Sequence, residues 1–169
     1  MNAPVKEQPN QPSWKSEGLD DLRRIAVDQL YEPPPEVPAG SSQEEALAIL
    51  AYHFGLNDLF PERCFVTPVA KVNIHHQHLP HIVEKRQDAR ERYVLYAIRT
   101  IEDPFEVWVC QYTNDRFRYA FSGAYASEKQ MYVIVDIQAG NVLWNFMQCD
   151  MKSLNKHRQG QLIYQRRCS

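Results

Sequence analysis

The sequence predicts an α+β fold in which N-terminal helices pack on one face of a four-stranded antiparallel sheet. Helical patterns dominate the first hundred residues, and four dense β-rich runs follow from residue 105 onward with short turns between them. Consecutive strands joined by short turns pair in antiparallel fashion. The helices that precede them are then left to cover the sheet.

The first 40 residues are predicted to be an extension outside the domain. Residues 1–16 are polar, contain three prolines and lack periodicity, so we expect a disordered tail. Residues 17–30 carry apolar side chains at helical spacing and predict a short amphipathic helix. The prolines of residues 33–38 favour an extended linker. The folded domain is therefore expected over residues 41–169.

The best-defined helix begins after Ser42 and ends before Gly55. Ser42 and Glu45 have the spacing of a capping box, in which each side chain bonds the other residue's backbone amide. Gly55 is suited to the left-handed residue that follows a helix.

The remaining elements alternate between β-rich and helical patterns. Residues 64–74 predict an edge strand or bulge, because Pro68 cannot donate to a sheet. A helix, bent at its charged middle, is predicted from Pro80 to residue 101 and is stopped at Asp103-Pro104. The main strands are predicted at 105–112, 117–125, 131–137 and 142–148, followed by a short polar helix at 151–158 and a closing apolar segment at 160–164.

Composition narrows the possible classes of protein. Residues 1–64 carry 5 Lys or Arg against 11 Asp or Glu, whereas residues 65–169 carry 14 against 10. The basic part suits a polyanion such as nucleic acid, and equally an ordinary mixed surface. No glycine-rich phosphate loop, GxGxxG, GxSxG or paired-carboxylate motif is present, which disfavours nucleotide-dependent enzymes. We expect no cofactor.

Targeting and cysteine patterns are also informative. No apolar run reaches the roughly 18–20 residues of a membrane span, and the N-terminus lacks the apolar core of a secretory signal. We expect no membrane partner and a cytoplasmic location, which can be that of a target cell after delivery. Cys64, Cys110, Cys149 and Cys168 lack CxxC spacing, which argues against a zinc ribbon and a disulfide scaffold.

Four of the six histidines lie within residues 75–81. A metal site is one interpretation, yet HExxH is absent and no cysteine lies nearby in sequence, so we expect no metal. The alternative is acid/base chemistry at His81. The unpaired amides of a helix start disfavour positive charge, so a neutral His81 after Pro80 can act as a base. Lys85 would share its helical face.

A set of cations and hydrogen-bonding groups accompanies this histidine. Arg116 and Arg118 are two residues apart and would leave one face of a strand together. Each residue alone is an ordinary surface group, and only their convergence would make a site. The other members of the set are Asn145, Lys152, Lys156, Arg158, Tyr119 and Tyr164.

Four stretches occur in an order typical of one family. They are LPHIVEKR with ARERYVLYAIRTIEDPFEVW (79–108), FRYAF (117–121), MYVIVDIQAGNVLWNFM (131–147) and SLNKHRQGQLIY (153–164). As an ordered set they resemble the phage-borne barnase/EndoU/colicin/RelE-like nucleases, the PBECR group of the BECR fold. The resemblance covers about residues 66–165.

The resemblance implies helices followed by an antiparallel sheet, and a metal-independent endoribonuclease that uses the 2′-hydroxyl of RNA as nucleophile. Residue by residue, it implies catalytic roles for His81, Arg118 and Arg158. Asn145 takes a position that we read as a small hydroxyl residue in relatives. Lys85, Lys152, Tyr119 and Tyr164 are candidates for binding the substrate.

The leading hypothesis is thus a small ribonuclease of toxin or effector type. RNA is the expected partner, with a cognate inhibitor, an immunity protein or a carrier as further candidates. Two alternatives stay open: a non-catalytic module that binds RNA or protein, and a metal-dependent enzyme built on the histidine cluster.

Overall fold

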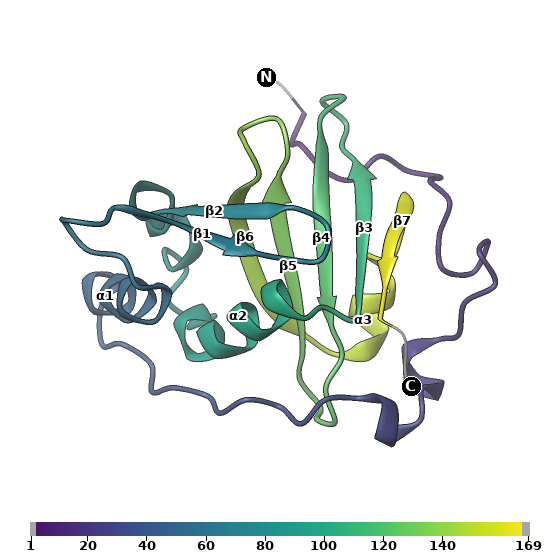
Figure 1. The fold of residues 1–169 in the computed structure, drawn as a ribbon, viewed down its shortest axis with the longest axis horizontal. Coiled ribbons are helices and arrows are strands. Elements are labelled where there is room, and N and C mark those ends of the chain that lie inside the picture. Colours follow the sequence, from purple (N-terminus) through teal and green to yellow (C-terminus); the bar gives the residue numbers. More distant parts are fainter. Residues whose placement is uncertain (1–2, 167–169) are drawn as a thin grey trace.

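The computed structural model describes residues 3–166 and contains one seven-stranded sheet with the strand order β1-β2-β6-β5-β4-β3-β7 (Figure 1). The elements, in chain order, are α1 Gln43–Phe54, β1 Glu62–Val66, β2 Lys71–His75, α2 Val94–Glu102, β3 Glu106–Gln111, β4 Phe117–Gly123, β5 Gln130–Asp136, β6 Val142–Cys149, α3 Met151–Asn155 and β7 Gln161–Gln165.

The four predicted central strands are confirmed as an antiparallel set, β3 to β6, but the predicted sheet of four strands is too small. β7 pairs with β3 on one side. On the other side the antiparallel β1–β2 hairpin joins through one parallel bridge between Asn73 and Val142. The pairings of β3 with β7 and of β2 with β6 link residues far apart in sequence, and local patterns carry no information about such pairings.

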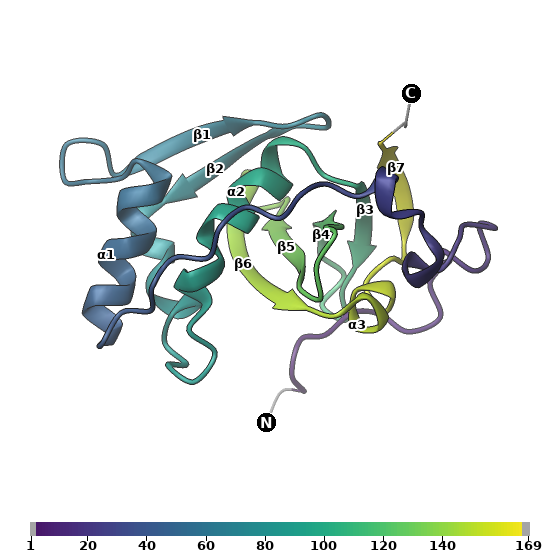
Figure 2. The same cartoon turned by 90° about the horizontal axis from the view of Figure 1, so that it is seen from below.

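Two apolar cores lie on opposite faces of the sheet because side chains alternate along each strand. Val107, Phe121 and Val133 face α1 and α2, whereas Trp108, Ala120 and Tyr132 face the other way. α2 lies across β4 and β5 on the first face, and α3 with Leu22 closes part of the second face (Figure 2). The sheet is curled (Figure 2).

The predicted helix after Ser42 is confirmed, but only one half of the predicted capping box forms, because the Glu45 carboxylate accepts from the Ser41 hydroxyl. The Ser42 hydroxyl accepts a hydrogen bond from the Glu45 amide at 3.1 Å. Gly55 ends the helix with φ of 76°, a left-handed conformation that glycine adopts without steric strain. The buried side of α1 joins the core beneath the β1–β2 hairpin.

The amphipathic helix predicted over residues 17–30 is wrong, and the tail expected to be disordered has defined contacts. Residues 17–30 form two 3₁₀ turns, Leu22–Arg24 and Val27–Gln29, because Leu22 alone is buried and it fits between α3 and the sheet. Isolated bridges join Glu7 to Tyr112 and Ser13 to Gln159. In Figure 1 the chain passes the β3–β7 end of the sheet and returns along the lower side to α1.

The long helix predicted from Pro80 to residue 101 is also wrong in its first half. Pro80–Ile82 is a single 3₁₀ turn, and regular helix begins only at Val94. Ala89 has φ of 43°, which an α-helix does not allow. A buried ion pair explains the break: the guanidinium of Arg86 bonds both carboxylate oxygens of Glu91 and the Gly40 carbonyl, which folds the loop back on itself.

Across residues 3–166 no helix is long and apolar enough to cross a membrane. The three cysteines in this range, Cys64, Cys110 and Cys149, are free thiols, and Cys168 lies outside the described residues.

Candidate active site

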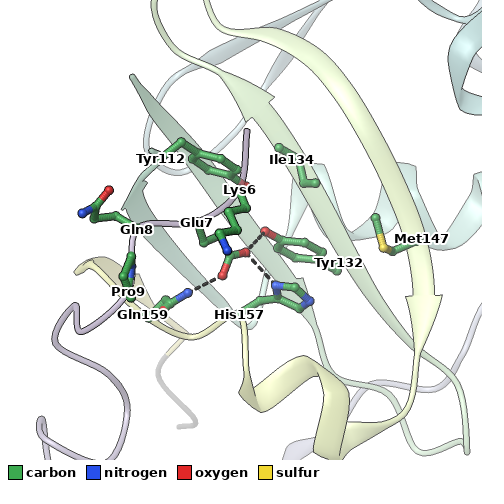
Figure 3. A pocket seen from close by; sticks show the side chains of 10 residues that line it. All are labelled: Lys6, Glu7, Gln8, Pro9, Tyr112, Tyr132, Ile134, Met147, His157 and Gln159. Atoms are coloured by element: carbon green, nitrogen blue, oxygen red, sulfur yellow. Dashed lines mark hydrogen bonds and ion pairs between the residues drawn. The ribbon is translucent and has the colours of Figure 1, made fainter. Parts of the chain in front are cut away.

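A pocket of about 440 Å³ opens on the face of the sheet opposite α2 (Figure 3). Its floor is Tyr132 and Ile134 of β5 with Met147 of β6, and one wall is the N-terminal segment, residues 6–9. The remaining lining residues are Tyr112, His157 and Gln159. The pocket is therefore lined both by residues 6–9 and by the segment after α3, which meet over the sheet.

Arg118 lies beside this pocket and is held by aromatic rings. Its guanidinium carbon is 4.3 Å from the centre of the Tyr112 ring and 5.0 Å from the centre of the Trp144 ring. Asp136, its register partner on β5, is instead paired with Arg116 at 3.4 Å. Within residues 3–166 the Arg118 side chain has no carboxylate partner and no hydrogen bond, so its donors are available to an anion.

Trp144 brings a second predicted residue to the same place. The register of β5 and β6 shifts between Ile134 and Val135, and Trp144 is left at this bulge with 37 % of its surface exposed. The His81 ring lies 5.0 Å from the Trp144 ring. His81 Nε2 also bonds the Trp144 carbonyl oxygen. His81 and Arg118 thus flank one tryptophan, although His81 is on a 3₁₀ turn and not at the start of an α-helix.

Asn145 is near these residues but is already engaged. Its side-chain oxygen accepts hydrogen bonds from Arg90 Nη1 and from the Phe146 amide, both at 2.8 Å. The Arg90 Nε is buried and has no partner among the described residues. Asn145 therefore fastens the 86–93 loop to the edge of β6, and its amide oxygen is not directed at Arg118.

A hydrogen-bonded cluster of three ionisable side chains occupies the pocket. His157 Nδ1 and Glu7 Oε1 are 2.7 Å apart, and the same oxygen accepts from the Tyr132 hydroxyl at 3.1 Å (Figure 3). The other Glu7 oxygen accepts from the Gln159 amide. The His157 ring stacks on Tyr132, with centres 4.0 Å apart and planes within 13°.

The hydrogen bonds of this cluster favour the ionised form of the Glu7 side chain. Burial is the largest influence and raises the pKa of this group, but the hydrogen bonds from His157, Tyr132 and Gln159 and the charge interaction with His157 together outweigh it, and the net pKa is lowered. Burial raises the pKa of Tyr132 well above its ordinary value, so its hydroxyl stays a donor. The imidazole is therefore held at Nδ1 by an anion, and Nε2 has no partner in the described part of the chain.

The segment after α3 that carries His157 and Arg158 packs closely against β3 at Gly160. The chain turns sharply at Gly160, where φ is 101° and an added Cβ would lie 2.1 Å from the Val109 carbonyl oxygen. The adjacent side chains of His157 and Arg158 then point to opposite sides, one into the pocket and the other into the protein.

Arg158 was predicted to be catalytic, and the structure buries it. Its side chain is 2 % exposed and makes a two-pronged ion pair with Glu106, at 2.7 Å from Nε and 2.9 Å from Nη2. Nη1 donates to the Asp20 carbonyl and to Asn155 Oδ1, both at 2.9 Å. A guanidinium with these partners cannot also reach a substrate, and the geometry favours a structural role.

The four predicted substrate-binding residues are dispersed. Lys85 is exposed on the 83–89 loop, away from any helical face shared with His81. Lys152 lines a second, basic pocket with Lys15 and Lys156. Tyr119 and Tyr164 pack against the α2-side core, on the face opposite Arg118. Only Lys152 is near the open pocket, because Gln159 lines both cavities.

Two of the four clustered histidines contact each other, and one of these two also contacts a carboxylate. His75 and His78 meet edge to face at 5.6 Å, and His75 Nδ1 lies 3.1 Å from Glu62 Oε2. Over residues 3–166 no group of three or more His, Cys, Asp or Glu side chains is arranged to hold a metal ion.

The sequence matches the family model PBECR2, described as phage-Barnase-EndoU-ColicinE5/D-RelE like nuclease2, over residues 50–165. The chain belongs to this nuclease family. A comparison with curated proteins and with solved structures gives no match.

The PBECR2 match contains His81, Arg118, Trp144 and His157, but it begins after the N-terminal segment that supplies Glu7. Sequence reasoning missed the Glu7–His157 pair. A signal for His157 was present, since it lies in the SLNKHRQGQLIY stretch between Lys156 and Arg158. Nothing in the sequence marks Glu7, because its role depends on a bridge to residue 112.

Proposed function

We propose that this PBECR2 protein is an endoribonuclease that cleaves RNA without a metal ion, by attack of the 2′-hydroxyl on the adjacent phosphate. The observation that carries the proposal is Arg118, a guanidinium without an anionic partner in residues 3–166, fixed between two aromatic rings beside an open pocket. Transesterification builds negative charge on the phosphate oxygens of the phosphorane, and preorganised donors directed at that charge are the largest expected contribution to the rate.

The neighbours of Arg118 suit this reaction. An arginine fork binds two phosphate oxygens at once, which a lysine cannot do. Trp144 is partly exposed and can stack an unpaired base of single-stranded RNA. His81, in contact with Trp144, is one of the two proton-transfer groups that the reaction needs.

The proposal is tested with purified protein, a chelator and a DNA oligonucleotide that carries one ribonucleotide. Wild-type protein should cut only after the ribonucleotide and leave a 2′,3′-cyclic phosphate, because only that position offers a 2′-hydroxyl. Arg118→Ala and His81→Ala should each lose on the order of 10²–10⁴-fold in rate.

Arg116→Ala is the matched control. It removes the same charge two residues earlier, from a guanidinium that is already paired with Asp136, and should keep the rate within about threefold. Cutting of all-DNA oligonucleotides at the same rate would refute the mechanism. Binding of RNA without cleavage from pH 5 to pH 9 would instead favour a non-catalytic RNA-binding module.

A further inference from the structure

We propose that His157 is a catalytic base of this site and that Glu7, from the N-terminal segment outside the matched family region, positions it. The inference rests on the proposed ribonuclease activity. It assigns the second proton transfer to His157, with Glu7, 150 positions away in the sequence, as the residue that orients it. The geometric basis is the 2.7 Å contact between Glu7 Oε1 and His157 Nδ1 inside the open pocket (Figure 3).

The contact determines which imidazole nitrogen can react. A carboxylate only accepts, so in the neutral imidazole the proton lies on Nδ1 and Nε2 keeps its lone pair. Nε2 has no partner in residues 3–166 and the side chain is 31 % exposed, so this nitrogen is accessible to substrate. Stacking on Tyr132 fixes the plane of the ring. The contact with Glu7 therefore sets the tautomer of the imidazole, the stacking on Tyr132 sets the plane of its ring, and its exposure leaves Nε2 accessible, all before substrate binds.

The N-terminal segment is built into the fold at this point. The Gln8 amide donates to the Gln111 carbonyl at 2.9 Å, and the Thr113 amide donates to the Lys6 carbonyl at 2.8 Å. The Gln11 side chain bonds both the amide and the carbonyl of Gln111. Residues 6–8 therefore extend the sheet beside residues 111–113, past the point where β7 begins its pairing with β3, and this pairing directs Glu7 into the pocket.

The surroundings favour a positioned base over a simple surface ion pair. The charged and titratable groups that face His157 are Glu7 and Lys6 from the N-terminal segment and Tyr132 and Tyr112 from the sheet side, with Lys156 next to it in the chain. Glu7 has three donors on its two oxygens, so its orientation does not depend on His157 alone.

In the proposed step, Nε2 of His157 takes the proton of the 2′-hydroxyl while the 2′-oxygen forms a bond to phosphorus. The bond from phosphorus to the 5′-oxygen breaks, and that oxygen receives a proton from His81, the other transfer group of the proposed function. The products are a 2′,3′-cyclic phosphate and a 5′-hydroxyl. His157 then returns its proton to water and His81 is reprotonated from water, so no proton is gained or lost.

The test compares pH–rate profiles of the full chain and its variants in chelator. His157→Asn keeps a donor for Glu7 but has no basic nitrogen, and should lose roughly 10²–10⁴-fold in rate. Glu7→Gln should lose at least about tenfold, and the acidic limb of its profile should move to lower pH, because the imidazolium has lost its anionic partner. An intact fold in both variants is checked by their urea midpoints.

The His75–Glu62 pair supplies matched controls, since it is a second histidine–carboxylate contact, remote from the pocket. Glu62→Gln and His75→Asn should leave the rate and profile unchanged. If Arg118→Ala abolishes cleavage while His157→Asn keeps wild-type activity, the inference is wrong and the proposed function stands. If wild type does not cleave RNA, both are wrong. A faster Glu7→Gln enzyme would overturn the positioning role and identify the segment as an inhibitory plug.

Discussion

Replacing Arg158 by alanine should destabilise the protein by about 3–5 kcal/mol without slowing cleavage by the molecules that remain folded. The guanidinium is 2 % exposed, and its partner Glu106 is 1 % exposed. The alanine variant leaves the Glu106 carboxylate buried, with one remaining side-chain donor, the indole of Trp108 at 3.0 Å. Contacts to Asp20 and Asn155 are lost together with the ion pair.

The magnitude follows from the uncompensated charge and not from the ion pair itself. Removing one member of a buried pair typically costs 3–5 kcal/mol, whereas exchanging both members for neutral groups of similar size costs little. The double variant Glu106→Gln with Arg158→Met should therefore recover most of the loss. For a chain of this length the single variant should lower Tm by roughly 6–20 °C.

The assay combines urea unfolding with cleavage rates normalised to the folded fraction. Arg158→Lys, which keeps the charge but not the fork, should be intermediate in stability. A loss below about 1 kcal/mol in the alanine variant, together with a fall of about 10²-fold or more in normalised rate, would refute the structural role and restore the catalytic one.

Three further predictions concern stability and reactivity. Leu22→Ala should lower the free energy of unfolding by about 2–5 kcal/mol, since Leu22 is fully buried; a loss near zero in urea unfolding would mean that the N-terminal segment is not docked. Burial opposes ionisation of Glu91, yet Arg86 lowers its pKa below the ordinary 4.5, so the pair stabilises the fold above about pH 4.5 and is lost as pH falls through the lowered value. Urea midpoints between pH 3 and pH 6 should flatten in Glu91→Gln. A thiol reagent at pH 8 should label exposed Cys64 quickly and Cys110 only after unfolding, because burial raises the pKa of Cys110 to about 12; equal rates would contradict the burial.

Local patterns predicted the elements that local interactions determine. β3 to β6 were placed within about two residues because each is a dense apolar run bounded by turn residues. The Ser42 and Gly55 caps were predicted because they bond within their own helix. The two helices that failed, over residues 17–30 and 80–93, are segments whose conformation is set by partners far along the chain, as in the hydrogen bond from Gly40 to Glu91.

The site was predicted only in part for the same reason. His81 and Arg118 meet at Trp144, so the ordered motifs carried real information about which residues gather on this part of the sheet. Arg158 and His157 are neighbours in sequence, and sequence alone does not tell which side chain of such a pair turns inward; the structure buries Arg158 and places His157 in the pocket. The role of an arginine next to a glycine turn, structural or catalytic, cannot be read from the sequence until Glu106 is known to lie beneath it.

The contacts of the N-terminal segment also determine when the pocket can exist. Glu7 is separated from His157 by 150 positions. The Gly160 amide donates a hydrogen bond to the Pro12 carbonyl, and the Trp14 amide donates to the Arg158 carbonyl. During synthesis residues 6–9 leave the ribosome before residues 151–160, which complete the surface on which they dock. A nascent chain therefore cannot close the wall formed by residues 6–9 until α3 and the turn at Gly160 have emerged. Until the turn at Gly160 has emerged, the ribosome and its messenger RNA face a chain that has no finished pocket.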